Sequence, residues 1–221
     1  MTPTVRIDFI SDISCPWCII GLRALEQAVE RLDGEVRVDW HFQPFELQPD
    51  MPRGGEKLTD LMQRKFGGSA QDALKKRSMI AERAAAEGFE MRLSETARVY
   101  NTFDAHRLLH WAGLEGRQHA CKRALFDAHF TRGEAMDDPD VLVAVAERAG
   151  LDRDAARAVV TSNLYAQEVR ADEALWRDRG IQSVPAIVID EKYLISGGQP
   201  VETFEQALRQ IAAEPAGALP N

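Results

Sequence analysis

Hydrophobic and polar positions alternate at the start of the chain and then change period. Apolar side chains occupy every second position of segment 5–10 (VRIDFI), a pattern typical of a strand. From Pro16 to Leu32 the apolar residues recur at three- and four-residue steps, which predicts a helix with one buried stripe. Segment 36–42 (VRVDWHF) alternates again. Because βαβ units are right-handed and join parallel strands, we expect these two strands to be parallel.

Helical periodicity dominates the middle of the chain, after a loop rich in proline and glycine. We expect helices over 58–66, 71–87, 102–114, 117–132, 138–149 and 153–179, the last of them broken, with no strand among them. Strand patterns return at 186–189 and 193–195, joined by a short turn. A helix at about 200–213 follows, with Pro200 near its first position, and then a tail over 215–221 that we expect to fray.

This order of elements predicts an α/β protein. A βαβ half, a run of helices and a ββα half are the arrangement of a thioredoxin-like fold with a large all-helical insertion between its two halves. We therefore assign residues 1–56 and 180–221 to a thioredoxin-like domain and residues 57–179 to an inserted helical domain.

Composition narrows the range of partners and compartments. The chain has 221 residues, of which 45% are hydrophobic, and Lys+Arg 27 against Asp+Glu 35 gives a net charge of −8. The absence of a basic cluster argues against nucleic acid and anionic membrane as partners. The first residues lack the basic and apolar regions of a signal peptide, and no apolar run is long enough for a membrane span. We expect a cytoplasmic protein, and the sequence carries no signal for an oligomeric state.

The motif Cys15-Pro16-Trp17-Cys18 stands where the first strand gives way to the first helix. Pro16 suits the first helical position, where its missing N–H would be unpaired anyway, so Cys15 is the expected N-cap. A sulfur at a helix N-terminus meets unpaired N–H groups and the positive end of the helix dipole, which favour a thiolate. We predict that Cys15 is a solvent-accessible nucleophile. Cys18, one turn further along and more shielded, is the predicted resolving thiol.

The motif could instead have a purely structural role, as a static disulfide or as half of a zinc site. Zinc would need a second ligand pair, whereas the remaining cysteine, Cys121, is isolated. A static disulfide suits a secreted protein, whereas we expect a cytoplasmic one. We expect Cys121 to be structural, in the helical core on a face with Leu114, Leu125 and Ala128. His106 and His110 are four residues apart but flank a buried stripe without a third ligand, so we predict no metal site.

The motif, the insertion of helices and Ser183-Val184-Pro185 before the third strand together resemble the DsbA family of thiol-disulfide oxidoreductases. Four segments resemble more narrowly its FrnE-type branch, the polyketide-biosynthesis dithiol-disulfide isomerases. These segments are 12–18 (DISCPWC), 44–49 (PFELQP), 101–107 (NTFDAHR) and 195–200 (ISGGQP). The resemblance spans nearly the whole chain.

The resemblance implies several site residues. Pro185 matches the family's cis-proline opposite the CxxC motif, which would leave the backbone of Val184 free to pair with an extended substrate. The alternative is a trans proline that starts an edge strand. Pro16 and Trp17, between the cysteines, would tune the redox couple and contact the substrate, with Trp17 at an exposed rim.

Other residues keep two interpretations. The family's helical domain caps the active site, which implies substrate contact for Asn101, Thr102 and His106; alternatively, Asn101 or Thr102 caps the helix that follows. Asp12 either hydrogen-bonds nearby loop amides or accepts the proton of Cys18.

The predicted function is disulfide reduction or isomerisation through a mixed disulfide on Cys15 that Cys18 resolves. The expected substrates are disulfide-containing proteins or small molecules, with no bound cofactor and with glutathione as a candidate electron donor. In a cytosol whose glutathione poise is near about −220 mV or lower, such a couple stays largely reduced, which favours reductase or isomerase over oxidase. The rival hypotheses are a kappa-class glutathione transferase or 2-hydroxychromene-2-carboxylate isomerase, which uses a single Ser or Cys, and a peptide-binding chaperone.

Overall fold

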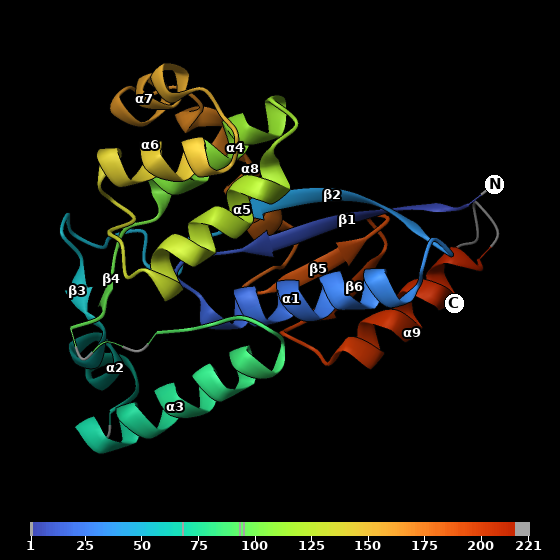
Figure 1. Cartoon of the computed structure of the whole chain (residues 1–221), viewed down its shortest axis with the longest axis horizontal. Coiled ribbons are helices and arrows are strands. Elements are labelled where there is room, and N and C mark those ends of the chain that lie inside the picture. Colours follow the sequence, from blue (N-terminus) through green and yellow to red (C-terminus); the bar gives the residue numbers. More distant parts are fainter. Residues whose placement is uncertain (1, 68, 93, 95, 215–221) are drawn as a thin grey trace.

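The computed structural model of the chain describes residues 2–67, 69–92, 94 and 96–214 (Figure 1). The tail predicted over 215–221 lies outside the described residues. The main sheet has the strand order β2-β1-β5-β6. Its strands are β1 (Thr4–Ser11), β2 (Arg37–Pro44), β5 (Ala186–Ile189) and β6 (Tyr193–Ser196). The predicted α/β class and thioredoxin-like fold are confirmed.

Strand pairing follows the predicted connections. β1 and β2 are parallel, with Val5 opposite Val38, as the βαβ interpretation required. β5 is antiparallel to β1, with Phe9 opposite Ile187, and β6 is antiparallel to β5. From Ile7 to Ser11 every residue of β1 is buried, because this strand lies inside the sheet and both of its faces are covered.

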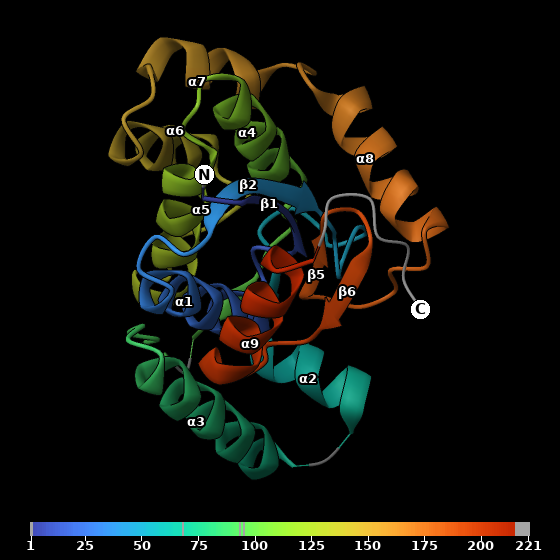
Figure 2. The same ribbon diagram turned by 90° about the vertical axis from the view of Figure 1, so that its right-hand side faces the viewer.

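Helices α1 (Pro16–Arg31) and α9 (Val201–Ala212) pack side by side against one face of the sheet (Figure 2). Pro200 is the N-cap of α9 rather than its first helical residue. A close backbone approach fixes α1 against the loop after β6. A Cβ atom on Gly21 of α1 would lie 3.1 Å from the Cα atom of Gly198 and 3.3 Å from Cγ of Pro185.

The segment assigned to the insertion separates into two parts (Figure 1). The larger part consists of α4 (Phe103–Leu114), α5 (Gln118–Phe126), the π-helix η1 (Asp127–Thr131), α6 (Pro139–Arg148), α7 (Arg153–Thr161) and α8 (Ala166–Asp178). Helices α4, α5 and α8 contact the edge strand β2. Gln118 of α5 closes that edge at Phe42: its Oε1 accepts from the Phe42 N–H at 3.0 Å and its Nε2 donates to the Phe42 carbonyl at 3.1 Å.

The smaller part comprises α2 (Leu58–Phe66) and α3 (Ala70–Ala86), which lie apart from the larger part, on the side of the molecule where α1 begins (Figure 1). It also contains β3 (Glu56–Lys57), which pairs antiparallel with β4 (Arg98–Val99). The expectation of an insertion without strands was therefore wrong. Two-residue strands are too short to produce the alternating pattern that reveals a strand. Among the described helices, none is long and apolar enough to cross a bilayer.

Candidate active site

The CxxC motif occupies the junction between β1 and α1, as predicted. Cys15 is the N-cap with extended backbone angles (φ −88, ψ 114), and Pro16 follows in the first turn. The Cys18 N–H donates to the Cys15 carbonyl at 3.0 Å, which closes the first turn and places the two side chains on adjacent positions. Cys15, Cys18 and Cys121 all carry free thiols.

The loop that precedes β5 lies directly against Cys15. The Val184–Pro185 peptide bond is cis. The Sγ atom of Cys15 lies 3.7 Å from the Val184 carbonyl oxygen, a distance at which the thiol donates a weak hydrogen bond. The Gly197 N–H donates to the Pro185 carbonyl at 2.8 Å and ties this loop to the end of β6. Together with the approach of Gly21 to Gly198, these contacts fix the helix start against the Val184 backbone.

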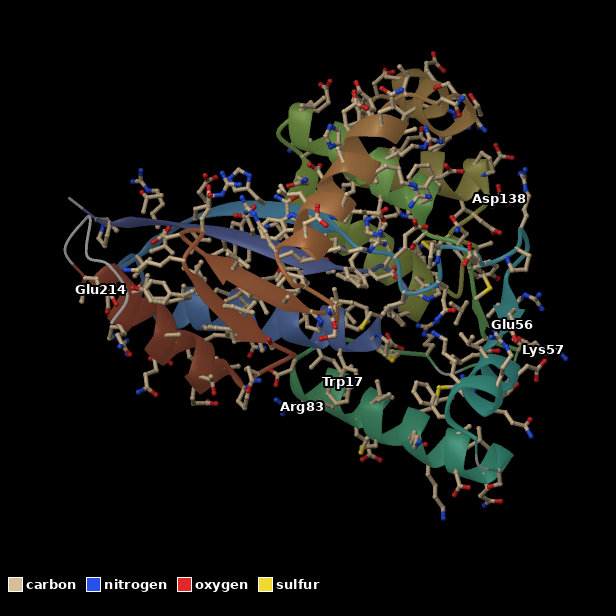
Figure 3. The ribbon with its side chains drawn as sticks, turned by 180° about the vertical axis from the view of Figure 1, so that it is seen from behind. Trp17, Glu56, Lys57, Arg83, Asp138 and Glu214 are labelled. Atoms are coloured by element: carbon tan, nitrogen blue, oxygen red, sulfur yellow. The ribbon has the colours of Figure 1, made fainter. Side chains whose placement is uncertain are left out.

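Cys15 is less exposed than the sequence predicted. Only 5% of its surface is accessible, because the Val184 carbonyl and the residues around the helix start cover it. It opens into a groove of about 430 Å³ between α1 and the α2–α3 hairpin. The groove walls are mostly apolar and include Trp17, Leu61, Met62, Met79 and Ile80. Trp17 is 38% exposed and lies on the side of the molecule that carries α3 (Figure 3).

Cys18 is buried more deeply than Cys15, with no exposed surface. Burial, and then its interaction with Cys15, raises the pKa of the Cys18 thiol well above its ordinary value, while Lys122 acts in the lowering direction. Burial raises the pKa of Cys121 to about 12. The predicted core face around Cys121 is confirmed for Leu125 and Ala128, which are buried. Leu114, predicted on the same face, is 65% exposed at the end of α4. Neither Cys18 nor Cys121 therefore ionises readily at neutral pH.

Asp12 anchors the loop that leads into the motif. Its Oδ1 accepts hydrogen bonds from the Ser14 N–H at 3.0 Å and the Thr102 hydroxyl at 2.9 Å, and its Oδ2 accepts from the Leu47 N–H at 2.7 Å. The side chain is fully buried. This geometry matches the first interpretation of Asp12, a carboxylate that hydrogen-bonds nearby amides, and joins three separate segments beneath the thiols.

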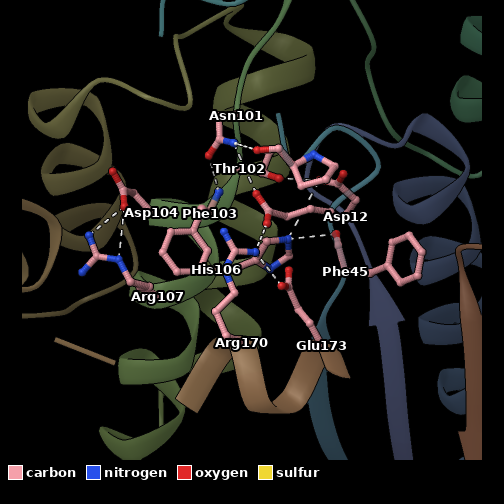
Figure 4. Close-up of polar contacts among 12 residues, drawn as sticks. Asp12, Phe45, Asn101, Thr102, Phe103, Asp104, His106, Arg107, Arg170 and Glu173 are labelled. Carbon is pink, nitrogen blue, oxygen red and sulfur yellow. Dashed lines mark hydrogen bonds and ion pairs between the residues drawn. The ribbon is translucent and has the colours of Figure 1, made fainter. Parts of the chain in front are cut away.

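Asn101, Thr102 and His106 lie near Asp12 in a connected set of polar contacts (Figure 4). The Asn101 Oδ1 accepts from the Phe103 N–H at 2.9 Å, so this side chain satisfies a donor at the start of α4. Thr102 is the N-cap residue, but its hydroxyl bonds Asp12 rather than the helix. His106 Nε2 lies 3.2 Å from the Phe45 carbonyl, and burial lowers the pKa of His106 to about 3. With 3% and 2% of their surfaces exposed, Thr102 and His106 are buried and do not line the groove beside Cys15.

Sequence reasoning missed an ion cluster next to this network, in which the side chains of Glu46 and Glu173 are buried and that of Arg170 is 47% exposed. Arg170 of α8 forms a short ion pair with Glu46 and donates to Glu173 Oε2 at 2.7 Å, and its guanidinium lies 3.8 Å from the centroid of the Phe103 ring (Figure 4). Burial raises the pKa of Glu46 to about 7, against the lowering influence of Arg170. The cluster joins α8 to the segment after β2, residues far apart in sequence, which no local pattern reveals.

Lys122 of α5 is the second residue that sequence reasoning missed. It has no exposed surface, and its position is the apolar one expected three residues before Leu125 and four before Phe126. That spacing was the available signal, because it places a lysine on the buried stripe of an amphipathic helix.

Comparisons with known proteins agree with this geometry. The family model of the DSBA-like thioredoxin domain matches residues 6–209. A crystal structure of a probable DsbA oxidoreductase from Streptomyces coelicolor is 35% identical, with a TM-score of 0.89 over 98% of this chain and 94% of that chain. Among known sequences, the uncharacterized protein YwbO of Bacillus subtilis is 26% identical over 206 residues, which are 93% of this chain and 96% of that protein.

More distant structures share the fold. A 2-hydroxychromene-2-carboxylate isomerase is 17% identical, with a TM-score of 0.69 over 93% of this chain and 95% of that one. The cytosolic disulfide reductase DsbM from Pseudomonas aeruginosa, solved with GSH, is 15% identical, with a TM-score of 0.61 over 93% of this chain and 98% of that one.

Proposed function

Because the chain belongs to the family of DsbA-like thioredoxin domains, we propose that it is a thiol-disulfide oxidoreductase that works through Cys15 and Cys18. The observation that carries this proposal is the position of Cys15, an N-cap thiol that faces the Val184 carbonyl at 3.7 Å, with Cys18 one turn behind it. The Cys15 thiol stands at the N-terminus of α1, and the groove beside it gives a substrate disulfide access.

The reaction begins when the Cys15 thiolate attacks one sulfur of a substrate disulfide. The substrate S–S bond breaks, one substrate thiolate leaves and takes up a proton, and the other half remains bonded to Cys15. Cys18 then loses its proton and attacks the Cys15 sulfur, which releases the second substrate thiol and forms the Cys15–Cys18 disulfide. Two electrons pass from the dithiol to the substrate.

The Val184 backbone orients the substrate in this scheme. Its carbonyl meets the Cys15 thiol in the resting protein, and an extended peptide would pair with the Val184 N–H and C=O beside the attacked sulfur. Backbone pairing is indifferent to side-chain identity, so the apolar groove supplies the preference: a peptide or small molecule with apolar groups next to its disulfide.

Reduction or rearrangement of disulfides in the cytoplasm is the direction we propose. At a reducing glutathione poise the Cys15/Cys18 couple starts as a dithiol, which can reduce a disulfide or isomerise it without net electron transfer. Two thiol molecules such as glutathione would return the oxidised enzyme to the dithiol and leave as their own disulfide. The related fold solved with GSH makes glutathione the first donor to test.

The proposal is tested by trapping the intermediate. Cys18→Ser should accumulate a mixed disulfide with insulin or a small aromatic disulfide, whereas Cys15→Ser should accumulate little or none. Cys121→Ser, which changes a buried thiol outside the motif, serves as the control and should turn over like the unmodified protein. Equal trapping by both motif variants would contradict the assigned roles, and full activity of Cys18→Ser with glutathione would indicate a transferase or isomerase with a single catalytic residue.

A further inference from the structure

Lys122 presents an unusual environment for an ammonium group. It is fully buried, its Nζ has no hydrogen-bond partner among the residues that the structure describes, and Nζ lies 4.7 Å from the centroid of the Phe126 ring. A buried charge without hydrogen bonds lowers the free energy of unfolding, and a methionine would fill the same space without that loss. A lysine at this position therefore lowers stability and calls for a functional explanation.

The charged and titratable groups around Lys122 come from several elements. Asp12, in the loop before α1, and the thiols Cys15 and Cys18 interact electrostatically with it, as does Cys121 on its own helix. His106 of α4 also interacts electrostatically with Lys122, and burial keeps His106 neutral. Asp12 and Cys18 have no exposed surface, so water screens little of their interaction with Lys122.

We propose that Lys122 is a positioning residue for the resolving thiol, whose buried ammonium group stabilises the Cys18 thiolate while it attacks the mixed disulfide on Cys15. This inference rests on the proposed function and deepens it, because Lys122 acts through Cys18 and touches no substrate. Asp12 fits the same arrangement: its carboxylate partly balances the ammonium in the resting protein, when Cys18 is an uncharged thiol.

Lys122 stays positively charged throughout the resolving step. The Cys18 thiol releases its proton, its sulfur forms a bond to the Cys15 sulfur, the bond between Cys15 and the substrate breaks, and the departing substrate thiolate takes up a proton. Lys122 keeps its own proton throughout. Burial lowers the pKa of Lys122 to about 8, which leaves the ammonium form predominant at pH 7. Burial raises the pKa of Cys18, and Lys122 opposes that rise.

The test separates the two steps in time. With a small aromatic disulfide whose two thiolate products are coloured, the first release reports the attack by Cys15 and the second reports the resolution by Cys18. In stopped-flow measurements at pH 7, Lys122→Met should slow the second release at least about tenfold and change the first by less than about threefold. The difference in the rate of the second release between Lys122→Met and the unmodified protein should narrow above about pH 8, where the native lysine loses its charge. Arg123→Met removes the same charge from the next residue of α5, a side chain 58% exposed, and should leave both releases unchanged.

Other outcomes would overturn the inference. A second release at the native rate, or equal slowing of both releases at all pH values, would assign Lys122 a structural role or none. Lys122→Gln is the second variant, and failure of both variants to fold would also contradict the inference, because loss of a destabilising buried charge should not unfold the protein. If the unmodified protein produces no first release, the proposed function itself fails, which this design distinguishes from failure at Lys122.

Discussion

The two cysteines of the motif are one helical turn apart along α1, and their thiols have different surroundings. Cys15 opens into a groove whose walls are apolar side chains of α1, α2 and α3, several of them partly exposed. Cys18 lies in a fully buried region, called the floor here, which also contains Asp12 and Lys122, and Lys122 interacts electrostatically with both Cys18 and Asp12. The groove contributes apolar side chains that would bind the substrate. The floor contributes buried hydrogen bonds and charges that act on the Cys18 thiol. Changes on the two sides should therefore have different signatures.

The largest difference is expected in thiol reactivity. When the reduced protein is treated with iodoacetamide at pH 7, Cys15 should be alkylated at least about a hundred times faster than Cys121, because the Cys121 pKa of about 12 leaves almost no thiolate. Cys18, buried with a raised pKa, should also remain unmodified. Peptide mass spectrometry over time measures the order, and prior labelling of Cys121 or Cys18 would invalidate the contrast.

Asp12→Asn tests how much the buried Asp12 carboxylate of the floor contributes to stability. The amide cannot reproduce all the acceptor positions used by Ser14, Leu47 and Thr102, and it leaves Lys122 without a nearby negative charge. We expect the free energy of unfolding to fall by about 2–4 kcal/mol in urea denaturation. The control is Asp39→Asn on β2, where a carboxylate 60% exposed pairs with His41 and where we expect a change within about 0.5 kcal/mol. Equal losses in both variants would contradict a specially stabilised floor.

Glu46, in the ion cluster beneath the site, predicts a pH dependence of stability. Its pKa is raised from 4.5 to about 7 by burial, so between these values the folded protein holds a proton that the unfolded chain has released. The free energy of unfolding should therefore fall as pH rises from about 4.5 to about 7, by at most about 3 kcal/mol before screening. Glu46→Gln should flatten this part of the profile in urea denaturation at several pH values. Identical slopes in the two proteins would exclude Glu46 as the source.

The groove should give the smallest effect. Met79→Glu places a charge on an apolar wall and should raise KM for an apolar disulfide peptide by about three- to tenfold with little change in kcat, since it weakens binding without touching the thiols. Leu194→Glu is a matched control on β6, because both native side chains are 54% exposed and only Met79 lines the groove. Steady-state kinetics of both variants decide the point, and equal KM values would remove the groove from substrate recognition.

Periodicity and the motif position predicted most of the fold and the two thiols. The strands and helices of the thioredoxin-like halves appeared where alternating and three-to-four-residue patterns placed them, and α7 and α8 confirmed the predicted break. Local sequence did not indicate that the inserted segment splits into a hairpin beside Cys15 and a bundle above β2. That division depends on which apolar faces meet, and β3 and β4 are too short to show a period.

The supporting residues of the site were harder to predict for a different reason. Asp12, Glu46, Thr102 and Arg170 act through contacts across many residues of sequence, so each looks locally like an ordinary loop or helix residue. Lys122 lies on an apolar stripe, but a lysine there normally extends its charged end to the surface. Only the packing of α5 within the core shows that its ammonium stays inside.

The Gln118 side chain, which bonds both backbone groups of Phe42, affects whether another extended chain can pair with the β2 edge. An open strand edge is a template for strands from other molecules and so promotes aggregation. At Phe42 the side-chain amide of Gln118 occupies the donor and acceptor that an incoming strand would use, and α4, α5 and α8 contact the same strand. An extended polypeptide that approaches from the β2 side therefore meets an edge already filled at its centre. Gln118 thus blocks strand addition at Phe42 on the β2 edge, whereas the backbone of Val184 lies next to the Cys15 sulfur as a place where an extended chain can add.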